Sequence, residues 1–184
     1  MDKKDELIIL IAKARRGDEA AVAKVVELGK DRLYRYCLML TRRRESAEDL
    51  CQETFLRALQ KLNQLSEPGA FYGWLCQLAK NIYIDQLRLS SSKETPTSAV
   101  VPEAPAREPF VGEITGESDT GILVRTILSH FDPEDRHLLL LVDMEGHSYL
   151  EASEIMKVSE NAVRSRLHRI RQEFLKRYKG GETN

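Results

Sequence analysis

Residues 91–120 interrupt the helical pattern of the chain and constrain its fold more than any other feature. The segment holds four of the six prolines, many serine, threonine and glutamate residues, and no helical periodicity. Such a sequence cannot bury enough apolar area to offset the conformational entropy that ordering would cost. We therefore predict a flexible acidic linker over 91–120 that joins two domains, 1–90 and 121–184.

Both flanking regions have the pattern of α-helices, with apolar residues at helical spacing and no hairpin dipeptide of the Asn-Gly or Asp-Gly type. Ser46 and Asp49 have capping-box spacing, which predicts a helix over about 47–63. The Pro68-Gly69 turn precedes a further helix over about 70–89. On that helix four apolar residues should face the core: Phe71, Trp74, Leu78 and Ile82. These patterns indicate an all-α fold.

The C-terminal domain contains two further helix-start signals. Asp132 can cap a helix that has Pro133 in its first turn and acidic residues at the positive end of its dipole. Ser148 and Glu151 form a second capping box, which opens a helix over 149–156.

After a turn at 157–159, Ser159 caps the last helix and completes a helix-turn-helix. One stripe of that helix is apolar: Val163, Leu167, Ile170 and Phe174. The opposite face is polar: Asn161, Arg164, Ser165, His168, Arg171 and Gln172. Residues 159–181 carry seven basic side chains against two acidic ones. A helix of this kind fits the major groove, so the pattern favours DNA binding; the alternative is the solvated basic face of an ordinary helical hairpin.

Composition excludes several other classes. The longest aliphatic run, 7–11, is too short to cross a bilayer and no signal-peptide cleavage site follows it, so we expect a cytoplasmic protein. The three cysteines and four histidines have neither the spacing of a disulfide framework nor that of a metal site. No nucleophile elbow or phosphate loop is present. We therefore expect no catalytic residue, no metal, no cofactor and no small-molecule substrate.

Residues 132–174, with the sequence DPEDRHLLLLVDMEGHSYLEASEIMKVSENAVRSRLHRIRQEF, resemble the C-terminal promoter-reading domain of the extracytoplasmic-function sigma factors of bacterial RNA polymerase. The resemblance implies that the last helix reads the −35 promoter element. The implied contacts are Arg164, Ser165, His168 and Arg169, with phosphate or structural roles for Arg166 and Arg171. Lys157 stands where the family usually has glycine, which implies a positive φ at this turn residue.

Residues 45–59 (ESAEDLCQETFLRAL) and 70–88 (AFYGWLCQLAKNIYIDQLR) resemble the conserved second domain of the same family, in the same order. The resemblance implies that the first motif docks on the largest subunit of core RNA polymerase. The implied polymerase-binding residues are Asp49, Leu50, Gln52, Glu53, Phe55 and Leu56. Leu50 and Phe55 would supply buried anchor area, although Phe55 and Leu56 could instead belong to the core.

The second motif should contact the −10 element, where promoter opening requires capture of an extruded base. By resemblance the −10 site consists of Gly69, Ala70, Phe71, Lys80, Asn81 and Arg88. Asn81 would read a base edge, and Lys80 and Arg88 would hold phosphates. Phe71 is also a candidate for the core, because it shares a stripe with Ile82.

Together these resemblances imply an alternative sigma factor that binds core RNA polymerase and directs promoter-specific initiation without catalysing a reaction. They imply three partners: core RNA polymerase, promoter DNA and an anti-sigma factor, which could hold the protein at the membrane. The alternative is a stand-alone helix-turn-helix regulator that binds its operator without polymerase. That alternative has no dimerisation heptad to support it and leaves the AEDLCQETF motif unexplained.

Overall fold

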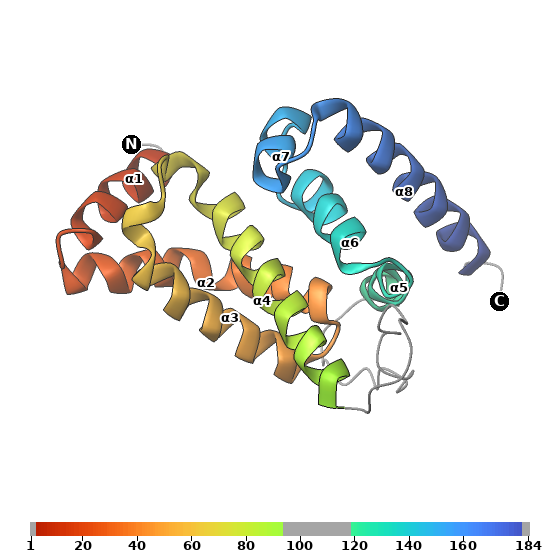
Figure 1. Cartoon of the computed structure of the whole chain (residues 1–184), viewed down its shortest axis with the longest axis horizontal. Coiled ribbons are helices and arrows are strands. Elements are labelled where there is room, and N and C mark those ends of the chain that lie inside the picture. Colours follow the sequence, from red (N-terminus) through yellow and green to blue (C-terminus); the bar gives the residue numbers. More distant parts are fainter. Residues whose placement is uncertain (1–2, 94–118, 182–184) are drawn as a thin grey trace.

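The computed structural model describes residues 3–93 and 119–181, which form two groups of helices (Figure 1). The N-terminal group contains α1 (Lys3–Ala14), α2 (Glu19–Thr41), α3 (Arg44–Gln60), the short 3-10 turns η1 (Leu62–Gln64) and η2 (Pro68–Ala70), and α4 (Phe71–Lys93). The C-terminal group contains α5 (Asp119–Leu128), α6 (Pro133–Leu139) with the π-helical turn η3 (Leu140–Met144), α7 (Tyr149–Met156) and α8 (Glu160–Gly181). No strand occurs in the described ranges, and the predicted all-α class with two helical domains is confirmed.

The predicted linker over 91–120 lies mostly outside the described residues. Its two ends are helical, because α4 continues to Lys93 and α5 begins at Asp119. Residues 94–118 are not among those described. In the described part of the chain, no helix is long and apolar enough to cross a membrane.

The N-terminal core lies between α2, α3 and α4, with α1 packed against α2. Its fully buried large side chains include Tyr36, Leu40, Leu50, Phe71, Leu75 and Ile82. Asp18 caps α2, because its carboxylate accepts a hydrogen bond of 3.0 Å from the Ala21 amide. The cap therefore fixes where the chain turns from α1 into α2.

The predicted start of α3 at Ser46 is wrong. Arg42 leaves α2 in the left-handed conformation, with φ 68°, and only Arg43 separates it from the first residue of α3, Arg44. Because the connection is this short, the helix begins at once, and Arg43 occupies the cap position without a side-chain hydrogen bond. Ser46 consequently lies inside the first turn of α3.

Gly29 sits in the middle of α2, where the Phe55 ring of α3 packs on its backbone. A Cβ atom at this position would lie 3.1 Å from Phe55 Cζ and 3.4 Å from Phe55 Cε1. Glycine lowers helix propensity, but here it allows α2 and α3 to approach closely. The contact also explains why the Phe55 ring is buried.

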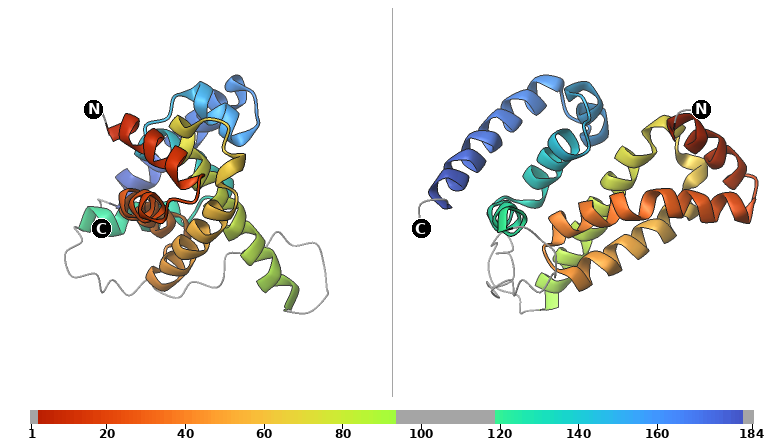
Figure 2. Two further views of the ribbon diagram at one scale, coloured as in Figure 1. Left: turned by 90° about the vertical axis from the view of Figure 1, so that its left-hand side faces the viewer. Right: turned by 180° about the vertical axis from the view of Figure 1, so that it is seen from behind.

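Helix α4 is buried on more of its circumference than the predicted stripe. Phe71 and Ile82 are buried as expected, whereas Trp74 and Leu78 are half-buried. The additional buried residues are Gly73, Leu75, Cys76, Ala79, Lys80 and Tyr83. The reason is tertiary: α6 and α7 of the C-terminal domain pack against α4 on the side away from its own domain (Figure 2).

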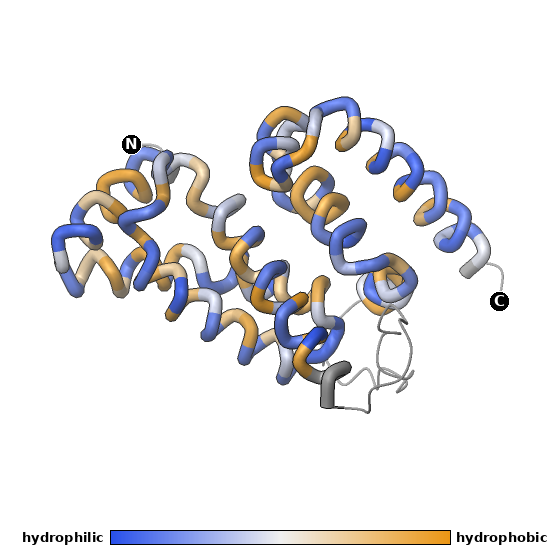
Figure 3. Tube along the Cα trace, in the orientation of Figure 1, coloured by the Kyte–Doolittle hydropathy of each residue, from blue (hydrophilic) through white to orange (hydrophobic). Residues whose placement is uncertain are grey.

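The C-terminal domain follows its predicted capping signals. The Asp132 carboxylate accepts from the Asp135 amide at 2.8 Å, and Ser148 and Glu151 make both bonds of a capping box at the start of α7. Lys157 has a positive φ of 56°, and the Ala162 amide donates to Ser159 Oγ at 3.2 Å at the start of α8. In α8 the residues Val163, Leu167 and Ile170 are buried, and the rest of the helix is largely hydrophilic (Figure 3).

We predict that Gly29→Leu lowers the free energy of unfolding by about 2 kcal/mol, because the added side chain would overlap the Phe55 ring. Urea unfolding followed by circular dichroism measures this change. Gly180→Leu is the matched control, because nothing lies within 4 Å of a Cβ atom at Gly180. An equal loss of stability in both variants would show that helix propensity or solubility, not the contact with Phe55, is responsible.

Candidate nucleic-acid interface

Helix α8 presents four of the predicted DNA-contacting side chains to solvent: Arg164, Ser165, His168 and Arg169. The Arg164 guanidinium donates to Glu160 at 2.9 Å and lies over the Tyr149 ring at 5.3 Å from its centroid. Arg169 is highly exposed and makes one hydrogen bond of 3.3 Å to Asp135. Because exposed ion pairs of this kind are weak, both arginines can exchange their partner for a phosphate or base edge at low cost.

Arg166 and Arg171 have structural contacts within the same domain. Arg166 donates to the carboxylate of Asp135 and lies 3.5 Å from Asp132. Arg171 makes two hydrogen bonds to Asp143 and donates to the Tyr149 hydroxyl at 3.0 Å. The hydrogen bond to Asp143 raises the pKa of Arg171 above its ordinary value. These contacts tie α8 to three other elements of the domain: α6, η3 and α7.

The predicted −10 residues do not form one cluster on α4. Phe71 is buried and packs edge-on against Tyr72, with ring centroids 5.7 Å apart, so its assignment to a DNA-binding surface is wrong and it belongs to the core. Gly69 and Ala70 are exposed in the turn η2. Asn81 is exposed on α4, and its side-chain oxygen accepts from Gln77 at 3.3 Å.

The helical geometry of α4 separates these positions. Ala70 and Asn81 are eleven residues apart, which corresponds to about 16 Å along a helix and to nearly the same face. A pocket for one base cannot include both residues at that separation. The predicted single −10 pocket therefore divides into two separate positions, one at each residue.

Lys80 and Arg88 differ in accessibility. Arg88 is exposed and lies 3.9 Å from Asp85. Lys80 is buried, and its ammonium donates to Glu134 of the C-terminal domain at 2.8 Å. Of the two predicted phosphate contacts, Lys80 is therefore covered by the C-terminal domain and Arg88 is accessible.

Helix α3 divides its predicted polymerase-binding residues between surface and core. Asp49, Gln52 and Leu56 are exposed, and Leu56 has 63% of its surface accessible. Leu50 and Phe55 are buried in the N-terminal core, so the prediction that they serve as anchors on a partner is wrong. They face α2 and α4, because the apolar stripe of α3 forms part of the N-terminal core.

Glu53 is half-buried at the edge of the same surface. Its carboxylate accepts from Arg57 in the next turn and from Gln86 of α4 at 2.9 Å. These bonds hold the carboxylate in place beside Gln52 and Leu56.

Two sequence-family models match the chain: Sigma-70 region 2 over residues 25–92 and Sigma-70 region 4 over residues 122–174. The chain is 35% identical to ECF RNA polymerase sigma factor SigE of Mycolicibacterium smegmatis over 165 residues, 86% of this chain and 63% of SigE. It is 26% identical to ECF RNA polymerase sigma factor SigW of Bacillus subtilis over 178 residues, 90% of this chain and 93% of SigW. The chain belongs to the extracytoplasmic-function group of sigma factors.

Solved structures share the fold of this sigma factor. CnrH, solved in complex with the cytosolic domain of CnrY, has a TM-score of 0.66 at 20% identity and covers 95% of this chain and 97% of its own. RpoE of Bartonella quintana, solved with the anti-sigma factor NepR, has a TM-score of 0.65 at 22% identity over 85% and 96% of the two chains. The sigma factor spans 63% of the length of SigE, which is less than two thirds.

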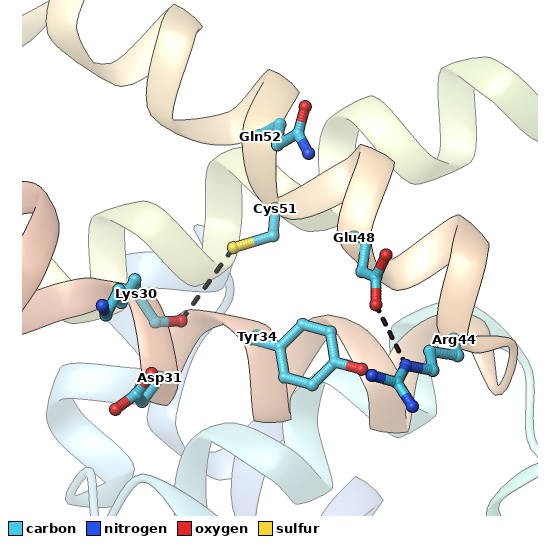
Figure 4. A pocket seen from close by; sticks show the side chains of 7 residues that line it. All are labelled: Lys30, Asp31, Tyr34, Arg44, Glu48, Cys51 and Gln52. Atoms are coloured by element: carbon cyan, nitrogen blue, oxygen red, sulfur yellow. Dashed lines mark hydrogen bonds and ion pairs between the residues drawn. The ribbon is translucent and has the colours of Figure 1, made fainter.

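A groove of about 420 Å³ borders the exposed residues of α3 (Figure 4). It is lined by Lys30, Asp31 and Tyr34 of α2 and by Arg44, Glu48, Cys51 and Gln52 of α3. Figure 4 shows Tyr34 pointing toward Arg44, which donates to Glu48 at 3.0 Å. The groove is open and of mixed charge, and it adds polar contact area next to Gln52.

The three cysteines, Cys37, Cys51 and Cys76, are buried and free. The Cys76 thiol has its pKa raised by burial, and the Cys37 thiol has its pKa raised by a hydrogen bond with Cys51 and by burial. Within the described residues no group of histidine, cysteine and carboxylate side chains could hold a metal ion. The thiols therefore act as small core side chains.

A polar network between the two domains was not predicted from the sequence. Tyr36 Oη of α2 lies 2.6 Å from Nδ1 of His137 on α6, and His137 Nε2 lies 2.8 Å from Oε1 of Gln77 on α4. A neutral imidazole with its proton on Nε2 satisfies both partners. The network continues from Gln77 to Asn81.

Two arginines complete the contact between the domains. Arg32 of α2 donates to the carboxylate and the carbonyl of Glu145 and lies over the Tyr72 ring at 4.2 Å from its centroid. Arg136 of α6 is buried and donates to the Leu40 carbonyl in the last turn of α2. These partners are about a hundred residues apart in the chain, so no local signal could have revealed them.

His137 lies at the centre of the network, and its environment keeps it neutral. Burial, assisted by the neighbouring Lys80, His147 and Arg166, lowers its pKa from 6.5 to about 3. The neutral state matches the hydrogen bonds to Tyr36 and Gln77.

We predict that the sigma factor loses stability as the pH falls below about 6.5, because the unfolded chain then binds a proton that the folded His137 excludes. The loss from this residue reaches about 1.4 kcal/mol at pH 5.5 and grows until the pH approaches the folded pKa of about 3. Urea unfolding between pH 5 and 8 measures it. His137→Gln should flatten the profile, whereas His168→Gln, at an exposed position, should keep it. A profile that His137→Gln leaves unchanged would contradict the assignment.

Proposed function

We propose that this protein directs promoter-specific transcription initiation by bringing core RNA polymerase to promoter DNA, and that it acts by binding rather than by catalysis. The observation that carries the proposal is that the two helical domains match sigma regions 2 and 4, and that α8 of the second domain presents Arg164 and Arg169 to solvent. Two separate domains of this kind suit a protein that engages two DNA elements at once.

The exposed residues of α3 form the proposed polymerase-binding surface. Leu56 supplies an accessible apolar side chain, with Asp49, Gln52 and Glu53 around it. This arrangement of an apolar anchor within a polar rim is typical of protein interfaces. Leu50 and Phe55 support the surface from beneath.

The exposed face of α8 is the proposed reader of the −35 element. Arg164, Ser165, His168 and Arg169 supply donors and acceptors suited to base edges and phosphates. Arg166 and Arg171 would set the orientation of α8 through Asp135 and Asp143.

The proposed −10 contacts follow α4 from η2 to Arg88. Asn81 offers an amide for a base edge, and Gly69 and Ala70 allow close approach of a strand at the start of the helix. Lys80 and Arg88 are the proposed phosphate contacts, and Lys80 requires release from Glu134.

An anti-sigma factor is a further proposed partner. CnrH was solved with the cytosolic domain of CnrY, and RpoE of Bartonella quintana with the anti-sigma factor NepR. Because these chains share the fold, a protein that covers the exposed surfaces of α3 or α8 would be a suitable regulator here.

Run-off transcription with purified core polymerase and a pool of genomic fragments tests the function. We expect new, discrete start sites that share upstream sequence at two positions. Tight binding to duplex DNA without polymerase, and no new start sites, would instead support a stand-alone regulator.

We predict that Leu56→Ser weakens binding to core polymerase about tenfold, because it removes an apolar anchor. Biolayer interferometry with immobilised core polymerase measures the affinity. Leu89→Ser is the matched control, since Leu89 on α4 is exposed to nearly the same extent, 65% against 63%. Equal losses in both variants would argue against the α3 surface.

We predict that replacing both Arg164 and Arg169 by alanine lowers initiation at promoters with a −35 element by about tenfold or more, through lost base and phosphate contacts. Initiation rates at promoters with intact and scrambled −35 elements provide the measurement. A double alanine variant of Lys176 and Arg177 removes the same charge from the other end of α8 and should retain promoter selection. Unchanged selection after loss of Arg164 and Arg169 would refute the orientation of the helix.

A further inference from the structure

We propose that Cys37 of α2 and Cys51 of α3 form an oxidation site, at which a hydroperoxide that enters the groove between the two helices converts the two thiols into a disulfide. In the reduced protein both thiols pack as small core side chains. The effect of the disulfide on polymerase binding rests on the proposed role of α3, whereas the oxidation itself does not.

Cys51 is the thiol that a reagent in solution can reach. It is 8% exposed and lines the open groove of about 420 Å³ between α2 and α3 (Figure 4). Cys37 is fully buried and Cys76 is 3% exposed, and neither of them lines the groove. Hydrogen peroxide has only two heavy atoms, so the groove is large enough to admit it.

Cys37 lies beside the accessible thiol. Cys51 Sγ lies 4.0 Å from the Lys30 carbonyl oxygen on α2, and Figure 4 shows it pointing across the groove toward that oxygen. A helical side chain leans toward the N-terminus of its helix, so Cys37 leans toward the same part of α2. The two thiols share a hydrogen bond. Oxidation would therefore join sulfur atoms that are already neighbours, at the disulfide length of about 2.05 Å.

The hydrogen bond gives the two thiols different roles. It lowers the pKa of Cys51, whereas the same bond, together with burial, raises the pKa of Cys37. Burial also raises the pKa of Cys76. Because the thiolate is the reactive form of cysteine, Cys51 is the nucleophile and Cys37 is the thiol that completes the disulfide.

Two steps form the disulfide. The Cys51 thiolate attacks one oxygen of hydrogen peroxide, the O–O bond breaks, and the other oxygen takes up the thiol proton and leaves as water. Cys51 is then a sulfenic acid. The Cys37 sulfur attacks the Cys51 sulfur, and the hydroxyl group leaves with the Cys37 proton as a second water. The thiols lose two electrons in total, and one peroxide is reduced to two waters.

The disulfide would join α2 to the helix that carries the proposed polymerase-binding surface. Gln52 directly follows Cys51, and Asp49 lies two positions before it; both side chains are exposed. Drawing Cys51 from hydrogen-bonding to covalent distance of Cys37 shifts α3 against α2. Because interfaces depend on close shape complementarity, we expect the oxidised protein to bind core polymerase less tightly.

Peptide mapping of the full chain tests the oxidation site. The reduced protein is treated with hydrogen peroxide, its remaining thiols are alkylated, and it is digested with trypsin. The three cysteines then lie on separate peptides, 36–42, 45–57 and 62–80. We expect a disulfide between the first two peptides and an alkylated Cys76. No disulfide, or one that includes Cys76, would overturn the proposal.

Three variants test the roles of the thiols. In Cys37→Ala, dimedone should trap a sulfenic acid on peptide 45–57, whereas in Cys51→Ala the Cys37 thiol should react about tenfold more slowly than Cys51 does. Cys76→Ala is the matched control for the loss of a buried thiol, and it should form the disulfide at the wild-type rate. Equal reactivity of Cys37 and Cys51 in the single variants would show general opening of the core and would overturn the assignment. The wild-type peptide map decides the proposal even if a variant is unstable.

Biolayer interferometry with immobilised core polymerase tests the consequence, with the peroxide removed before binding. We expect oxidised wild type to bind about fivefold more weakly, because its α3 surface is displaced, and dithiothreitol to restore the affinity. Peroxide should leave the affinity of Cys51→Ala unchanged. A disulfide that forms without loss of affinity would overturn the effect on polymerase binding. Failure of the reduced wild type to bind core polymerase would instead reject the proposed function, and the peptide map would still decide whether the oxidation site exists.

Discussion

Helix α4 is buried on two sides, and the rest of the structure depends on this double contact. One side carries Phe71, Leu75 and Ile82 into the N-terminal core. The other side lies against α6 and α7, where Gly73 allows close approach and Lys80 meets Glu134. The helix that is proposed to hold the −10 strand is thus also the helix on which the C-terminal domain rests.

The two sides of α4 are stabilised by different forces. The core side removes apolar area from water, which stabilises the domain itself and is not easily reversed. The interdomain side relies on the Tyr36, His137 and Gln77 network and on ion pairs, whose formation requires desolvation of polar groups. The same burial lowers the pKa of His137. The N-terminal domain therefore has a stable apolar core, whereas its contact with the C-terminal domain is polar and more easily replaced.

Local signals in the sequence predicted local structure well. Asp132, Ser148 and Ser159 cap the helices that they were expected to cap, because a capping bond joins residues only two or three positions apart. Three residues of the predicted stripe of α8, Val163, Leu167 and Ile170, are buried as their spacing indicated, and Phe174 is half-buried. The start of α3 was predicted too late. The connection through Arg42 and Arg43 is so short that α3 begins at Arg44, and Ser46 lies within the helix instead of capping it.

The sequence by itself determined the helices, the apolar stripe and polar face of α8, and the motifs that identify the family. Those properties depend on neighbouring residues and on periodicity, which a linear string contains. Only the tertiary structure decided that Leu50, Phe55 and Phe71 belong to the core and that Leu56 remains on the surface. It alone decided that Lys80 meets Glu134, a pairing of residues 54 positions apart. The physical reason is that burial and pairing depend on which helix faces come together, and each face of an amphipathic helix has more than one acceptable partner.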